Sequence, residues 1–205
     1  MPQFRAEVTS LNSNLVGALV RLAQCAGLQC DAVGSNMTPE EFQVRSLLWH
    51  QICFLDLHAA ETQGQQPKIR ADDFNTLRPI ESDDATCGYT LVSRSSTWTN
   101  ATFSLMRSEC NVVHRIILEK GVSIDNKTIK LATFRRLVER RKGEIEEKYL
   151  SRLDENQPIQ RCAKLVGKIL TGRFNVMLLY RYWKETEDTD FQREINDMYA
   201  RFFRI

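Results

Sequence analysis

The sequence of 205 residues has neither a strong excess of charge of one sign nor a long apolar run. Its 28 lysines and arginines nearly balance 26 aspartates and glutamates, so the net charge is only +2. A module that binds the phosphate backbone of nucleic acid by itself is usually far more basic. No stretch is long enough and apolar enough to cross a bilayer, and MPQFRAEVTS at the N-terminus contains no apolar core of a signal peptide. We therefore expect no direct DNA binding by this chain, no membrane contact, and a location in the nucleus or the cytoplasm.

The paired cysteine spacings of a structural zinc site are missing as well. The six cysteines are Cys25, Cys30, Cys53, Cys87, Cys110 and Cys162; only Cys25 and Cys30 have C-x₂₋₄-C spacing, and no second pair accompanies them. In a reducing compartment, free cysteine usually acts as a small buried residue. Cys53 and Cys110 fall on apolar helical faces and Cys162 lies near the start of another, so we expect a packing role and no metal.

The common catalytic motifs do not occur. The chain contains no G-x-S-x-G elbow, no phosphate-binding Walker loop, no G-x-G-x-x-G turn and no H-E-x-x-H pair. Of the three histidines, His50 and His58 are two helical turns apart and cannot chelate one ion together, and His114 stands alone. The sequence therefore predicts that the protein is not an enzyme and holds no cofactor. A small-molecule enzyme on a helical fold stays the least favoured alternative.

Two charged segments have ordinary structural interpretations. The acidic pairs Asp72–Asp73 and Asp83–Asp84 lie in a connection between prolines, where turn and cap roles are commoner than cation binding. The basic run FRRLVERRKGEIEEKYL, residues 134–150, resembles a nucleic-acid patch at first sight. Its glutamates alternate with arginines at helical spacings, so we expect a solvated, salt-bridged helix face.

The strongest helical signal covers residues 38–63. Thr38 is a good N-cap, Pro39 suits the first helical position, and Glu41 completes a capping box. The helix is predicted to end near Gln63–Gly64. Apolar residues cover nearly its whole circumference, which is typical of a buried helix. They are Leu48, Ile52, Leu55 and Ala59 in one stripe, with Trp49, Cys53 and Ala60 beside it.

Arg45 and Asp56 project into the richest apolar face of this helix. They are eleven residues apart, or roughly 16 Å along the axis, which is too far for them to pair. Because an unpaired buried charge is costly, each is expected to find a partner on another helix. We expect Asp56→Ala to lower stability by about 1–3 kcal/mol.

The remaining pattern predicts an all-α, irregular multi-helix bundle in a single domain over residues 1–205. A long ordered Gly/Pro loop is expected over about 64–94. The other predicted helices cover residues 11–26, from 95 or 96 to 121, 127–153, 158 to about 183, and 188–205. Their expected buried stripes include Leu15, Leu19, Leu22 and Ala26; Trp98, Leu105, Val112 and Ile116; Met106, Cys110, Val113 and Ile117; Phe134, Val138, Ile145 and Tyr149; and Phe191, Ile195, Met198 and Phe202.

The order of three segments resembles the regulatory ("middle homology") domain of fungal zinc-cluster transcription factors. These segments are ALVRLAQCAGL (18–28), RSLLWHQICFLD (45–56) and GQQPKIRADDFNTLRP (64–79). The matching positions are Arg21, Ala23, Gly27, Leu28, Arg45, Leu48, Trp49, Asp56, Gly64, Pro67 and Ile69. The segments at 99–115 and 146–170 look like later helices of some members. His50 stands where a second tryptophan is common, and Gln65 and Gln66 replace Arg–Pro.

This resemblance implies a nuclear regulator of transcription in a fungus. Its domain would work by conformational control, with other transcription factors, coactivators or a small-molecule effector as partners; a homodimer is left open. Arg45, Trp49, Asp56, Gly64 and Pro67 are then scaffold positions. DNA binding is implied only by the family, because the family's six-cysteine zinc cluster is absent, and we expect the domain to be incomplete relative to the family. The alternative is a helical protein-interaction scaffold without a promoter role.

Overall fold

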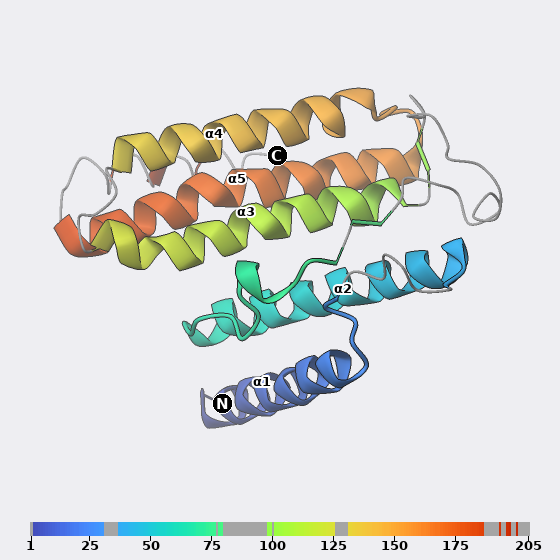
Figure 1. The fold of residues 1–205 in the computed structure, drawn as a ribbon. Coiled ribbons are helices and arrows are strands. Elements are labelled where there is room, and N and C mark those ends of the chain that lie inside the picture. Colours follow the sequence, from blue (N-terminus) through green and yellow to red (C-terminus); the bar gives the residue numbers. More distant parts are fainter. Residues whose placement is uncertain are drawn as a thin grey trace. The chain divides into compact units, whose positions relative to one another are not determined.

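In the computed structural model, the chain is described for residues 2–30, 37–76, 78–79, 98–99, 101–125 and 131–186, and at 193, 196, 197 and 200. These residues contain five α-helices and no strand, so the all-α prediction is confirmed (Figure 1). The helices are α1 (Pro2–Cys25), α2 (Pro39–Gln63), α3 (Thr102–Asp125), α4 (Leu131–Lys148) and α5 (Pro158–Thr186), with 3-10 helices η1 (Ala71–Asp73) and η3 (Leu150–Arg152).

The chain divides into two compact units, Met1–Arg115 and Ile116–Ile205. Helices α1 and α2 and the first part of α3 belong to the first unit, and α4 and α5 belong to the second. None of the helices that the structure describes is both long and apolar enough to cross a membrane. The expectation of one regulatory domain over residues 1–205 stays a prediction.

The ends of α2 lie where the sequence predicted them. The amide of Glu41 donates to Thr38 Oγ1 at 3.2 Å, and the amide of Thr38 donates to Glu41 Oε2 at 2.8 Å, which is a complete capping box. At the other end Gly64 has φ +63°, and its amide donates to carbonyls of the last helical turn. A left-handed residue here is easiest for glycine, so the helix stops at Gln63.

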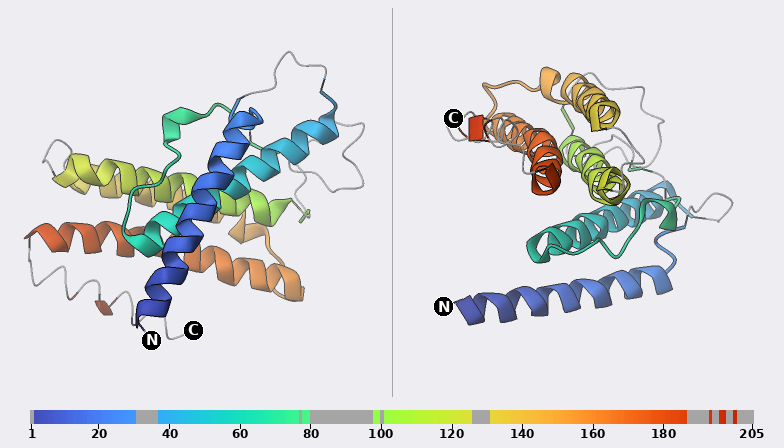
Figure 2. Two further views of the ribbon diagram at one scale, coloured as in Figure 1. Left: turned by 90° about the horizontal axis from the view of Figure 1, so that it is seen from below. Right: turned by 90° about the vertical axis from the view of Figure 1, so that its left-hand side faces the viewer.

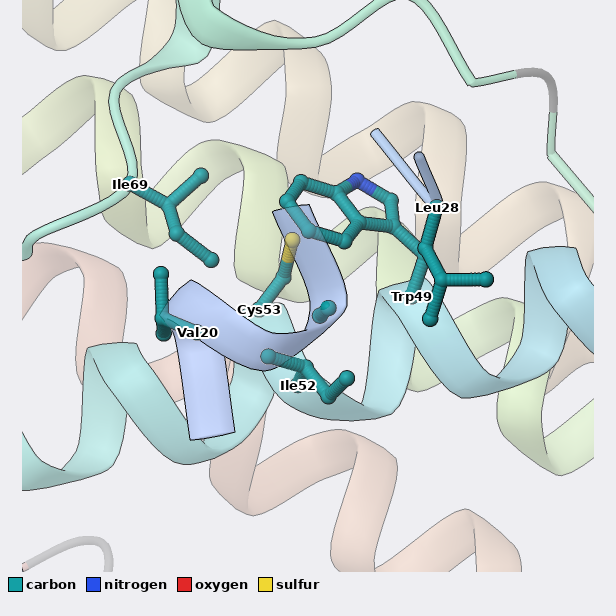
Figure 3. Close-up of a cluster of buried hydrophobic side chains, with 7 residues drawn as sticks. Val20, Leu28, Trp49, Ile52, Cys53 and Ile69 are labelled. Carbon is teal, nitrogen blue, oxygen red and sulfur yellow. The ribbon is translucent and has the colours of Figure 1, made fainter. Parts of the chain in front are cut away.

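The core of the first unit lies between α1, α2 and the segment after α2. Helix α1 crosses obliquely over α2 (Figure 2, left). Figure 3 shows apolar side chains from all three parts gathered in one cluster. Its buried members are Val20, Ala23, Leu28, Trp49, Ile52, Cys53 and Ile69.

The predicted buried face of α1 is wrong for Leu15, Leu22 and Ala26, which are exposed, whereas Leu19 is half-buried and packs against the core cluster. Leu15 and Leu22 are 60% and 68% exposed, whereas Val20 and Ala23 are each 4% exposed. The helix has two apolar faces, and α2 covers the one that contains Val20 and Ala23. The helix also begins at Pro2, nine residues earlier than predicted. On α2, Leu48 is likewise 47% exposed and does not extend the buried stripe.

Helix α3 begins later and ends later than predicted. Trp98 precedes the helix, because the Thr99 amide donates to Thr102 Oγ1 at 2.9 Å and Thr102 starts the first turn. Gly121 lies within the helix, which continues to Asp125. The stripe of Met106, Cys110, Val113 and Ile117 is buried as predicted. Of the other predicted stripe, Leu105 is buried, while Val112 and Ile116 are half-buried.

In the second unit, α4 and α5 pack against each other (Figure 1). The predicted inward residues are all buried: Phe134, Val138, Ile145 and Tyr149. Helix α4 is shorter than the predicted 127–153, because the chain turns into η3 after Lys148. Glu144 lies 3.7 Å from Arg140 and 3.0 Å from Arg141, so the salt-bridged face is confirmed.

Some expectations fall on parts of the chain outside those that the structure describes. They are the loop from 80 to 94, the acidic pair Asp83–Asp84, Cys87, and the inward face of the C-terminal helix with Phe191, Ile195, Met198 and Phe202.

Candidate functional site

Asp56 is the centre of a buried polar network in the first unit. Its carboxylate is 1% exposed and accepts hydrogen bonds from the backbone amides of Lys68 at 3.0 Å and Ile69 at 2.9 Å. Arg115 on α3 lies 3.4 Å away. The expected partner on another helix is therefore Arg115, and two backbone amides supply the other hydrogen bonds to the carboxylate.

Arg115, on α3, contacts both α2 and the segment that follows α2. Its guanidinium donates to the carbonyl of Cys53 at 3.0 Å and to the carbonyl of Ile69, in addition to its ion pair with Asp56. Because the ion pair is buried, these extra hydrogen bonds are what makes it tolerable. The network therefore fixes the segment after α2 against both α2 and α3.

The backbone between Gly64 and Ile69 brings the two amides to Asp56. The left-handed Gly64 turns the chain, and the amide of Gln65 donates to the Ala60 carbonyl at 2.9 Å. Pro67 is buried and Ile69 is fully buried, so the segment returns along α2. Lys68 also reaches α1, where its ammonium group lies 3.2 Å from Ser13 Oγ.

Arg45 contacts the end of α1. Its guanidinium donates to the carbonyl of Gly27 at 2.9 Å and to that of Ala26 at 3.4 Å. Gly27 itself has φ +68° and ends the helix. A cation beside the last carbonyls of a helix is favourable, both as a cap and because of the helix dipole. The partners of Arg45 are thus carbonyls of the two residues that directly follow another helix, α1.

Trp49, the remaining position of the predicted scaffold, is fully buried. Its ring meets that of Phe74 edge to face, with centroids 5.6 Å apart. Phe74 follows η1, so this contact also holds the segment after α2 against the helix. All five sequence-predicted scaffold positions lie in the first unit. Arg45 contacts the end of α1, whereas Asp56 and Trp49 both contact the segment after α2.

A cavity of about 380 Å³ opens between α2 and α3. Its apolar lining consists of Val44, Leu47, Leu48 and Pro79. Its polar lining consists of His50, Gln51, Ser104, Arg107, Ser108 and Asn111. This volume lies in the range of small-molecule sites, which combine apolar walls with a few polar groups.

Among the described residues that line the cavity, Arg107 is the only charged one. Its guanidinium lies 4.8 Å from the ring centroid of Phe54 and 5.9 Å from that of Phe103, and it donates to Gln51 Oε1. Partial burial lowers the pKa of this guanidinium. No carboxylate from the described parts of the chain forms an ion pair with it.

The histidines and cysteines form no metal site within the residues that the structure covers. His50 Nδ1 lies 3.0 Å from Ser108 Oγ, His114 is buried, and His58 is exposed. Burial raises the pKa of the thiols of Cys53 and Cys110 to about 12. The expected packing role therefore fits these two cysteines, but Cys25, Cys30 and Cys162 are exposed and do not fit it.

Sequence reasoning missed Arg115 and Arg107. Arg115 had a usable signal, because it is the only charged residue in the apolar run CNVVHRIIL, residues 110–118. An arginine in such a run is a natural candidate for the partner that Asp56 requires. Arg107 had none, because only the packing of α2 beside α3 places it at a cavity.

Comparisons with known proteins give relatives but no family match. No family model and no solved structure matches the chain. The C6 finger domain transcription factor hasF of Aspergillus fumigatus is 39% identical over 85 residues, which are 40% of this chain and 11% of that protein. The Aurofusarin cluster transcription factor aurR2 of Gibberella zeae is 24% identical over 191 residues, which are 90% of this chain and 28% of that protein.

An uncharacterised transcriptional regulatory protein of Schizosaccharomyces pombe is 24% identical over 180 residues, which are 87% of this chain. The chain spans between 11% and 28% of the length of these curated relatives. All three relatives carry names of transcription factors or transcriptional regulators. By sequence, the chain is therefore similar to a portion of fungal transcription regulators.

Proposed function

We propose that this chain is the helical regulatory part of a fungal transcription regulator that works in the nucleus. One observation supports this most strongly. The three segments whose order resembles the zinc-cluster regulatory domain, 18–28, 45–56 and 64–79, contact one another through two of the matching residues. Arg45 caps the helix in the first segment, and Asp56 binds backbone amides in the third.

The proposed mechanism is conformational control of α2 and α3. A ligand shifts such a domain only if it binds one arrangement better than another. The cavity between α2 and α3 is a place where a small molecule could do so. The network of Asp56 and Arg115 connects both helices to the segment after α2, so a shift of either helix would also change the contacts of that segment.

Other proteins complete this function. The 205 residues contain no cysteine pair with zinc-cluster spacing. We therefore infer that promoter DNA is contacted by a partner or by protein outside these residues. Coactivators or other transcription factors would then recognise the conformation of the helical domain.

A reporter assay tests the proposal. The full chain is fused to an unrelated DNA-binding domain in yeast, and transcription from a promoter with the matching site is measured. We expect reporter output to change several-fold relative to the DNA-binding domain alone. Asp56→Ala should remove the change at equal protein level, whereas the exposed Asp72→Ala should keep it. Output that equals that of the DNA-binding domain alone would refute a regulatory role.

A second candidate, a protein-interaction scaffold, is favoured by the outer face of α1. Leu11, Leu15 and Leu22 are 59%, 60% and 68% exposed. With Ala18 and Cys25, which are also exposed, they repeat at intervals of four and three residues, as in a coiled-coil seam. Under this proposal another helix, from a partner or from a second copy, packs on the seam. Light scattering of the chain and of a Leu15→Gln/Leu22→Gln variant would detect self-association through it.

A further inference from the structure

We propose that the cavity between α2 and α3 binds a small monocarboxylate with an apolar body, and that Arg107 holds its carboxylate. The inference assigns a ligand class to the effector site of the proposed function. The binding itself does not depend on gene regulation. A failure of the reporter assay and a failure of ligand binding are therefore separate results.

The first argument is the charge of Arg107. Arg115, which is buried, pairs with Asp56, and Arg78 pairs with Glu109 at 2.8 Å. Arg107 lines the cavity and has no such carboxylate among the residues that the structure describes. Removing a charge from water without a counter-charge is unfavourable. A ligand carboxylate would supply the missing negative charge at this point.

The second argument is that the guanidinium is already held in place. It lies over the rings of Phe54 and Phe103, at 4.8 and 5.9 Å from their centroids, and Gln51 accepts from one of its nitrogens. These contacts restrict the side chain before any ligand arrives, so little rotamer freedom is lost on binding. The planar fork of arginine also matches a carboxylate, which it can bind through two parallel hydrogen bonds.

The third argument is the composition and size of the rest of the cavity. Val44, Leu47 and Leu48 form an apolar wall on α2, and Pro79 adds to it. Ser104 and Asn111 on α3 supply a hydroxyl and an amide. With one cation among its described lining residues and an apolar wall, the site suits a single negative charge on an apolar body better than a polyphosphate. The volume of about 380 Å³ limits the ligand to a small molecule.

Binding of matched acids and amides to the full chain tests this inference. The probes are hexanoate, octanoate, phenylacetate and cinnamate, each compared with its neutral amide by isothermal titration calorimetry at constant ionic strength. We expect at least one acid to bind saturably and its amide to bind about tenfold more weakly or not at all, because a hydrogen bond to a charged group is lost. Saturable binding of none of the acids, or equal binding of acid and amide, would overturn the proposal.

Two variants place the binding in this cavity. Arg107→Gln should weaken the acid about tenfold or more, and Arg107→Lys should retain part of the affinity. The matched control is Arg136→Gln, at an exposed arginine on α4, which should bind like the wild type. Leu48→Trp fills the cavity from its half-exposed rim without changing charge, so it should also abolish binding while the chain stays folded. Wild-type affinity in either Arg107→Gln or Leu48→Trp would show that the acid binds elsewhere.

Discussion

The carboxylate of Asp56 and the guanidinium of Arg115 lie 3.4 Å apart in the interior of the first unit, although 59 residues separate them in the sequence. Their side chains are 1% and 4% exposed. A buried ion pair is tolerable only when its remaining donors and acceptors are satisfied. Here the amides of Lys68 and Ile69 and the carbonyl of Cys53 satisfy them, so the pair joins two helices and a loop.

Gly64 and Gly143, two glycines with open space around them, should respond oppositely to alanine. A Cβ at Gly64 or at Gly143 would meet no atom within 4 Å, but only Gly64 has a positive φ, of +63°. Gly64→Ala should therefore lower the free energy of unfolding by about 1 kcal/mol through backbone strain. Gly143→Ala, inside α4, should raise it by about 0.5–1 kcal/mol through helix propensity. Chemical denaturation measures both, and equal effects would contradict the assigned end of α2.

The face of α1 that packs on α2 can be tested with two truncations. Val20→Ala should lower stability by roughly 1–3 kcal/mol, because it leaves a cavity in the core cluster. Leu22→Ala removes a larger side chain but should change stability by only about 0.5 kcal/mol or less, because Leu22 is 68% exposed. Thermal and denaturant unfolding of the two variants show which substitution lowers stability more. The reverse order would mean that the sequence-based assignment of the face was correct after all.

Thiol reactivity should separate the five cysteines that the structure describes into two groups. Cys25, Cys30 and Cys162 are exposed and should react quickly with iodoacetamide at neutral pH, whereas Cys53 and Cys110 should react only on unfolding. Mass spectrometry of the digested protein would show which residues are labelled. Rapid labelling of Cys110 in the folded chain would be incompatible with its burial.

The same burial has a consequence at alkaline pH. It raises the pKa of the Cys53 and Cys110 thiols from 9.0 to about 12, so between these values the unfolded chain releases the protons that the folded chain keeps. Stability should therefore fall as the pH rises from 9 towards 12. Denaturation midpoints at several pH values should fall less steeply in Cys110→Ala than in the wild type. An identical slope in the two proteins would count against this origin.

Local signals were enough to predict α2. Its cap depends on Thr38 and Glu41, and its end depends on Gly64, so the relevant contacts lie within a few residues of one another. The need of Asp56 for a distant partner also followed from one helix alone, because a buried carboxylate must be satisfied whatever surrounds it.

The buried face of α1 and the position of the cavity depend on which elements pack together. No local periodicity of the sequence specifies that packing. Helix α1 has apolar residues on two faces, and only the position of α2 decides that Val20 is buried and Leu22 is not. The sequence alone does not distinguish Arg107 from a surface arginine, because only the folded structure places its guanidinium over the ring of Phe54 from α2. For the same reason the cavity of the first unit could not be predicted from the sequence.

A double-mutant cycle on Asp56 and Arg115 tests the central claim, that this ion pair holds α2, α3 and the segment after α2 together. Asp56→Ala should cost about 3 kcal/mol, at the upper end of the range expected from the sequence, because it strands a buried arginine. Arg115→Met and the double variant complete the cycle. We predict a coupling energy of about 1.5 kcal/mol or more. If the stability losses of the two single variants add up to that of the double variant to within about 0.5 kcal/mol, the two side chains do not interact in the folded protein.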